Sequence, residues 1–200
     1  MTEHGTHGEG GMEQQYHRRW RGGGLGRLLM VATGDVDLDG APEIVACAGR
    51  ELKVYRWTGD TYALQAEAAL PKDALSLSVG QVDPSGPGTV AVGTRDNVLL
   101  YALTPSGLVA LCQTLLYPNA YFRSLSLDDV NGDGRAEVIA GASGAQTIYL
   151  YQVMAVGRES RLEELGRLYV GGLVAARPTP SGELVAATKD GWVDVYVPCA

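Results

Sequence analysis

A fourfold internal repeat is the feature that most constrains how this chain can fold. Equivalent loops begin at Asp35, Gln81, Asp129 and Arg177, which are 46, 48 and 48 residues apart. Each unit contains a short apolar strand, a Gly/Asp loop, a second apolar strand, a Tyr-bearing third strand, a polar hairpin and a fourth strand. Four-stranded units of roughly 40–50 residues are typical of β-propeller blades. The sequence therefore predicts an all-β protein, a β-propeller of four four-stranded blades.

The repeats also set the expected domain boundaries. Residues 13–200 are expected to form the propeller domain, preceded by a disordered tail at residues 1–12. The repeats span approximately 27–72, 73–120, 121–168 and 169–197. The last repeat ends at Val197, just after its third strand. Because unpaired strand edges promote aggregation, we expect residues 13–21 to supply the missing strand, complete the last blade and close the ring.

Two further expectations concern strand assignment and ring size. The segment ESRLEELGRL at 159–168 has a helical composition, but it occupies the fourth-strand position of the third repeat. We interpret it as a strand. Two arrangements satisfy the strand count: a monomeric four-bladed ring, which we favour because repeats pack on their neighbours, and an eight-bladed dimer formed by domain swapping.

Two of the four loops are rich in oxygen ligands. Loop one (residues 35–43) and loop three (residues 129–137) both follow the pattern D-x-[DN]-x-D-G-x-x-E. Ca²⁺ binds six to eight oxygens, which alternate residues of a tight loop can provide. We predict two Ca²⁺ sites, formed by Asp35, Asp37, Asp39, the carbonyl of Ala41 and Glu43, and by Asp129, Asn131, Asp133, the carbonyl of Arg135 and Glu137.

Charge supports a metal in these loops over a plain polar turn. Residues 35–43 carry −4 and residues 128–137 carry −3, which together equal the formal net charge of −7. Two carboxylates ~4 Å apart repel by about 4 kcal/mol at an effective dielectric constant of 20. Loop two (residues 81–89) keeps one carboxylate, and loop four (residues 177–183) is shorter and begins with a cation, so neither is expected to bind metal.

An EF-hand begins with the same ligand pattern but is excluded. It requires a bidentate glutamate at position 12, where this chain has Ala46 and Ala140. The apolar run that follows each loop is also typical of a strand rather than a helix.

The segments GDVDLDGAPEIV and DDVNGDGRAEVI resemble the FG-GAP/VCBS-type repeats of integrin α-subunit propellers and many bacterial proteins. The resemblance implies a propeller in which the loop between the first two strands of a blade binds Ca²⁺. Propellers of that family usually have seven blades, whereas this chain has four repeats. Its ninth loop position is glutamate rather than the commoner aspartate, and a Phe-Gly pair is missing.

Composition excludes several functional classes. The net charge of −7 disfavours binding to nucleic acid or to an anionic membrane surface. We find no apolar run of the ~18 residues needed to span a membrane. The histidines, His4, His7 and His17, lie in or beside the polar N-terminal tail, so a His-based catalytic constellation is not evident. The three cysteines are widely spaced, which favours reduced thiols over disulfides or a zinc site.

The sequence therefore predicts a non-enzymatic, calcium-binding propeller module that interacts with another protein or a glycan. The alternative is an enzyme, a lyase or hydrolase, that uses a central pocket of the propeller. A structural fragment of a larger assembly is a third reading. A signal peptide is not readable, so we expect a cytoplasmic protein, or an extracellular one if a leader has been removed.

Overall fold

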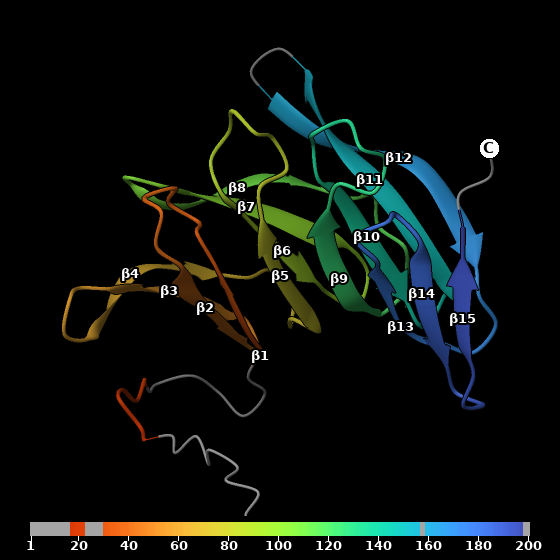
Figure 1. Cartoon of the computed structure of the whole chain (residues 1–200), viewed down its shortest axis with the longest axis horizontal. Helices are drawn as coiled ribbons and strands as arrows, with labels where there is room; N and C mark the ends of the chain where they lie inside the picture. The colour runs from red at the N-terminus through yellow and green to blue at the C-terminus, as the bar shows by residue number, and fades with distance from the viewer. Residues whose placement is uncertain (1–16, 23–29, 157–158, 198–200) are drawn as a thin grey trace, which may run out of the picture.

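The computed structural model describes residues 17–22, 30–156 and 159–197, and these residues form an all-β structure (Figure 1). Fifteen strands make four separate sheets, and all strand pairs are antiparallel. In the described part of the chain, no helix has the length and hydropathy needed to cross a lipid bilayer. The all-β prediction is confirmed.

Each repeat forms one sheet, called here blades one to four in chain order. Blade one contains β1 (Met30–Gly34), β2 (Glu43–Ala48), β3 (Glu51–Trp57) and β4 (Tyr62–Ala69). Blade two contains β5 (Ser76–Gly80), β6 (Thr89–Gly93), β7 (Val98–Thr104) and β8 (Gly107–Gln113). Blade three contains β9 (Phe122–Asp128), β10 (Glu137–Ala142), β11 (Thr147–Val156) and β12 (Glu159–Tyr169). Blade four contains β13 (Leu173–Pro178), β14 (Leu184–Thr188) and β15 (Val193–Tyr196).

Alternating side chains pack each blade against both neighbours. On β6, Val90 and Val92 join the core shared with blade one, while Ala91 between them joins the core shared with blade three. On β10, Val138 joins that second core and Ile139 joins the core shared with blade four. Since successive residues of a strand point to opposite faces, a sheet buried on both sides needs apolar residues throughout. The apolar second strands therefore place the middle blades between two neighbours.

The segment at 159–168, predicted as a strand despite its composition, is β12. Its exposure alternates residue by residue along the strand, as expected for an outer strand with one face on the sheet. β12 pairs along the whole of β11, with one register shift between Leu150 and Tyr151. Equivalent shifts precede Tyr55 in blade one and Tyr101 in blade two, so the bulge is part of the repeat.

The blades follow one another in an open arc. The first strands of successive blades contact one another, β1 with β5, β5 with β9 and β9 with β13. The four sheets do not close into a ring, so the closed four-bladed ring is not seen. Within the residues that the structure describes, blade four has three strands.

The predicted pairing of residues 13–21 with the last blade is also not seen. Residues 13–16 lie outside the described residues, and residues 17–22 form no strand. Trp20 instead packs against blade one, with its ring centroid 5.2 Å from Tyr55 and 5.4 Å from Tyr62. Arg19 lies 4.0 Å over the ring of Trp57. These aromatic and cation–π contacts explain why the segment lies on blade one.

Candidate metal centre

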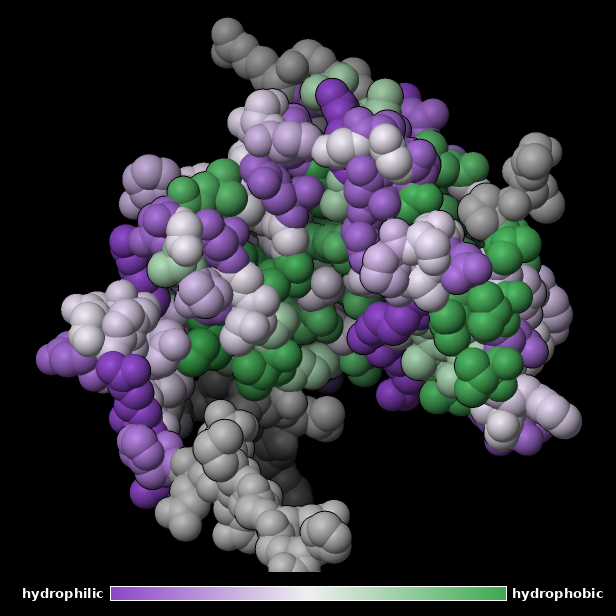
Figure 2. Space-filling view, in the orientation of Figure 1, coloured by the Kyte–Doolittle hydropathy of each residue, from purple (hydrophilic) through white to green (hydrophobic). Residues whose placement is uncertain are grey.

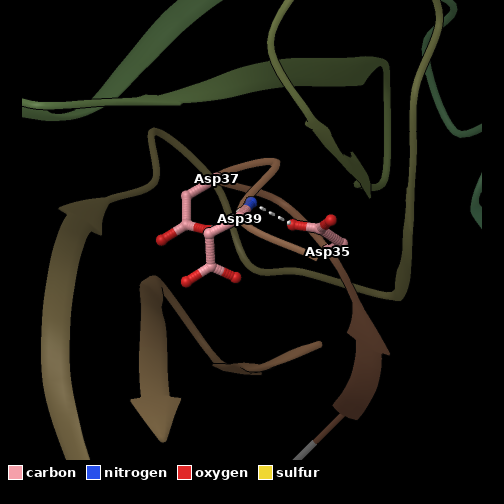
Figure 3. Close-up of side chains that lie close together, drawn as sticks. All are labelled: Asp35, Asp37 and Asp39. Carbon is pink, nitrogen blue, oxygen red and sulfur yellow. Dashed lines mark hydrogen bonds between the residues drawn. The ribbon is translucent and has the colours of Figure 1, made fainter. Parts of the chain in front are cut away.

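Loop one connects β1 to β2 and folds around its own carboxylates (Figure 3). The Asp35 carboxylate accepts the backbone N–H groups of Asp39 and Gly40, at 3.1 and 2.9 Å. Asp37 accepts the N–H of Asp39 at 3.3 Å, and Asp39 accepts that of Ala41 at 2.9 Å. As a result, one oxygen from each of the three aspartates lies within 4.8 Å of the others. The predicted ligands Asp35, Asp37 and Asp39 are therefore brought together.

Loop three has the same fold. The Asp129 carboxylate accepts N–H groups from Gly132, Asp133 and Gly134, at 2.7, 3.1 and 2.8 Å. Asp133 accepts the N–H of Arg135 at 2.9 Å, as Asp39 does for Ala41 in loop one. The peptide groups of Ala41 and Arg135, predicted to contribute carbonyls, therefore occupy equivalent positions in the two loops.

Both loops need a left-handed backbone at two positions. Loop three uses glycine at both, Gly132 with φ 76° and Gly134 with φ 84°. Loop one has Gly40 with φ 88° but places Leu38 at φ 62°. Glycine adopts this region without a steric penalty, whereas a leucine there is strained. The carboxylate hydrogen bonds of loop one therefore hold a conformation that Leu38 disfavours.

A fully buried glutamate lies beneath each loop. Glu43 and Glu137 each have 0% of their surface exposed. Glu43 Oε2 accepts the N–H of Val36 at 3.0 Å, and Glu137 Oε2 accepts that of Val130 at 3.1 Å. Burial raises the pKa of both carboxyls, and the nearby charge of Asp37 raises that of Glu43 further. The ninth loop residue is thus directed into the protein.

The second oxygens of these glutamates differ in their partners. Glu137 Oε1 accepts the side-chain amide of Asn131 at 3.1 Å. Glu43 Oε1 is buried and has no hydrogen-bond partner. Leaving a buried acceptor unpaired is costly, and more so when it carries charge. Glu43 is not part of the group of carboxylates whose oxygens lie within 4.8 Å of one another.

The structure adds side chains that the sequence reasoning missed. Arg56 on β3 pairs with Asp37 and Asp39, and Gln65 on β4 donates to Asp37 at 2.7 Å. In blade three, Gln152 on β11 donates to Asp133 at 3.0 Å. Arg56 and Gln152 each follow the recurrent tyrosine of the third strand, which is the signal that could have identified them.

Loops two and four are held by internal hydrogen bonds of ordinary turns. Gln81 donates to the carbonyl of Gly86 at 3.0 Å, and the Asp83 carboxylate accepts both the N–H and the hydroxyl of Ser85. Those bonds lower the pKa of Asp83. In loop four, the Glu183 carboxylate accepts the hydroxyls of Thr179 and Ser181, both at 3.2 Å. Each of these loops already pairs its carboxylate with neutral donors.

The cysteines and histidines show no catalytic arrangement within the described residues. Cys47 and Cys112 are free thiols, and burial raises their pKa to about 12 and about 11. Thiols with such pKa values are poor nucleophiles at neutral pH. His17 is exposed, whereas His4, His7 and Cys199 lie outside the described residues.

Comparison with known families identifies one repeat directly. The FG-GAP repeat model matches residues 121–151, a range that contains β9, loop three, β10 and the first half of β11. FG-GAP repeats are typically found in non-enzymatic binding modules. A comparison with curated proteins gives no match. The chain therefore contains an FG-GAP repeat, within an all-β structure that fits a propeller-like repeat fold.

Proposed function

We propose that this protein is a non-enzymatic, calcium-binding module of the propeller type that interacts with another protein or a glycan. The observation that carries the metal assignment is loop one. It brings three carboxylates within 4.8 Å of one another, and the glutamate at its ninth position is buried with one oxygen that has no hydrogen-bond partner. The FG-GAP match supports the interaction role.

The donor set suits Ca²⁺ better than a transition metal. All candidate side-chain ligands are oxygens, and hard cations such as Ca²⁺ prefer carboxylate and carbonyl oxygens. The ligands would be Asp35, Asp37, Asp39, Ala41 and Glu43 in loop one, and Asp129, Asn131, Asp133, Arg135 and Glu137 in loop three. The bound ion would supply positive charge where each loop concentrates negative charge, and would fix the start of the following strand.

Calorimetric titration with CaCl2 and thermal melting with and without EGTA test this proposal. We expect binding of two ions and a higher melting temperature with Ca²⁺, because a ligand that binds only the folded state stabilises it. The gain is about 2.7 kcal/mol when free Ca²⁺ is 100 times its Kd. A titration without heat, together with an unchanged melting temperature, would refute the metal assignment.

A pair of matched substitutions locates the site. Asp37→Ala should weaken one Ca²⁺ site by removing a ligand of loop one. Asp83→Ala removes the carboxylate of loop two, which Ser85 already satisfies, and should leave both Ca²⁺ affinities unchanged. Equal effects of the two substitutions on Ca²⁺ affinity would argue against ligation by Asp37.

The apolar end of the arc supports a protein partner. Trp192, Val193, Val195 and Val197 are each more than half exposed, and Figure 2 shows apolar residues gathered over β14 and β15. A contiguous apolar patch of this kind is typical of an interaction surface. Pull-down with the wild type and with Trp192→Ser compares binding through this patch, and equal recovery would place the partner elsewhere.

We also propose that residues 13–21 exchange their contacts with blade one for pairing with β15, which would complete blade four and close the ring. A mainly apolar groove supports this proposal; its apolar side chains are Val130, Leu150, Leu168, Leu184, Tyr196 and Val197, and Asn131 and Gly182 also line it. In blades one to three the outer strands β4, β8 and β12 contact one another in turn. Blade four has no outer strand in the described residues, so the facing part of blade three is left uncovered.

A further inference from the structure

Arg56 extends from β3 over the acidic face of loop one. Its guanidinium nitrogens contact the outer oxygens of two predicted ligands, Asp37 Oδ2 at 3.5 Å and Asp39 Oδ2 through a hydrogen bond. Gln65 on β4 donates to the same Asp37 oxygen at 2.7 Å. The inner oxygens of both aspartates accept backbone N–H groups. Arg56 and Gln65 therefore hold the oxygens of Asp37 and Asp39 that accept no backbone N–H group.

Blade three carries a neutral side chain at the position of Arg56. Arg56 follows Tyr55 and Gln152 follows Tyr151, and the two tyrosines pair with equivalent residues of β2 and β10. Gln152 donates its amide to Asp133 at 3.0 Å. Both side chains thus reach the fifth position of their loops, one as a cation and the other as an amide.

The charges of the two blades differ in a compensating way. Loop one has Asp37 where loop three has Asn131, which gives it a fourth carboxylate. Arg56 in place of Gln152 adds one positive charge beside that carboxylate. Asp37 and Arg56, which form an ion pair in blade one, are therefore replaced by the neutral side chains of Asn131 and Gln152 in blade three.

We propose that Arg56 is an internal counter-cation of loop one, which holds the loop together without metal and competes with Ca²⁺ for Asp37 and Asp39. A divalent ion must displace the guanidinium, whereas in loop three it displaces only amide donors. Loop one should thus bind Ca²⁺ more weakly than it would with glutamine at position 56. Because loop three has no such arginine, its stability should depend more on bound metal. The competition rests on the calcium binding proposed above.

Titration of Arg56→Gln with CaCl2 tests the competition. In an Asp129→Ala background, which disables loop three, we expect Arg56→Gln to raise the Ca²⁺ affinity of loop one about two- to fivefold, the scale of a partly exposed ion pair. The matched control is Arg50→Gln, which removes another exposed arginine, 3.6 Å from Asp73, and should leave the affinity unchanged. An unchanged affinity in Arg56→Gln would overturn the competition.

Melting in EGTA tests the counter-cation role without any metal. Arg56→Gln should lower the metal-free melting temperature more than Arg50→Gln, because the aspartates of loop one lose their cation. The reciprocal substitution Gln152→Arg should raise the metal-free melting temperature and weaken Ca²⁺ binding by loop three. If neither loop binds Ca²⁺, the proposed function and the competition both fail, and the metal-free melting temperatures alone decide the role of Arg56. Equal melting temperatures of Arg56→Gln and Arg50→Gln in EGTA would overturn the counter-cation role of Arg56.

Discussion

At the scale of single residues, buried acids distinguish blades one and three from blade two. Glu43, Thr89 and Glu137 occupy the same position at the start of the second strand, and all three are fully buried. Blade two thus has a neutral hydroxyl group at the position where blades one and three have a buried carboxylate. Among the described residues, the buried carboxylates occur only beneath loops one and three, where each accepts the N–H of the second loop residue.

Substitution of Glu43 should therefore act in opposite directions with and without metal. Glu43→Gln removes a buried charge whose second oxygen is unpaired, so we expect a higher melting temperature in EGTA. With CaCl2 the same change removes a ligand charge and should weaken Ca²⁺ binding by at least about tenfold. Scanning calorimetry of both states measures the two effects. A lower melting temperature in EGTA would mean that the ionised carboxylate stabilises the fold by itself.

Cys47 should be protected from alkylation until the protein unfolds. With a pKa of about 12, roughly one Cys47 thiol in ten thousand is ionised at pH 8. The pKa of Cys47 in the folded protein lies above the ordinary thiol value. The buried neutral thiol therefore adds to the free energy of unfolding below about pH 8.5, and this contribution is lost as the pH rises toward 12. Iodoacetamide labelling with mass spectrometry, in a Cys199→Ser background, measures the protection. Rapid labelling of Cys47 in the folded protein would contradict the buried assignment.

At the scale of elements, the joints between blades repeat as the strands do. Ser76 on β5 donates its hydroxyl to the Phe122 carbonyl of blade three at 2.8 Å. Ser124 on β9 accepts the N–H of Ala176 in blade four at 3.0 Å. Gly93 and Gly141 lie against these serines, and the lack of a side chain there lets the neighbouring blade approach. The interface thus depends on a Ser–Gly pair.

Gly93→Ala should consequently destabilise the junction between blades two and three. A Cβ at this position would collide with the Phe122 carbonyl oxygen and the Ser76 hydroxyl, and the carbonyl cannot move without shifting β9. We expect a loss of about 2 kcal/mol or more in the free energy of unfolding. The control Gly166→Ala adds a Cβ to β12 with no atom within 4 Å, and should be neutral or slightly stabilising. Urea denaturation compares them, and similar midpoints would contradict the tight joint.

The sequence predicted the elements well because local pattern and burial agree in this chain. The repeat spacing identified the four sheets, and the position of residues 159–168 outweighed their helical composition. The ligand pattern likewise identified Asp35, Asp37 and Asp39, whose oxygens come together, but it also included Glu43, which lies outside that cluster. The contacts of Arg56 and Trp20 could not be predicted, because they depend on how separate elements approach rather than on spacing within a loop.

At the scale of the whole molecule, stability is distributed over three separate cores. Each core lies between two adjacent blades, and the arc leaves the outer faces of blades one and four without a neighbouring blade in the described residues. Val31 on β1 and Val193 and Val195 on β15 are accordingly more than half exposed. In a repeat architecture, such ends are the places where a cap, a further strand or another chain adds stability.

The mass of the protein in solution distinguishes the ways in which these ends can be covered. If residues 13–21 close a four-bladed ring within one chain, sedimentation equilibrium should give the monomer mass of 21.1 kDa. If they pair with a partner chain instead, a stable species of twice that mass should form and be lost when they are deleted. We expect the monomer, because closure within one chain does not require a second molecule.

Deletion of residues 1–21 should then expose the β15 edge and cause aggregation, whereas deletion of residues 1–11 should not. Equal solubility of the two truncated proteins would rule out closure by this segment, and a dimer unaffected by its removal would indicate association through the apolar ends of the arc.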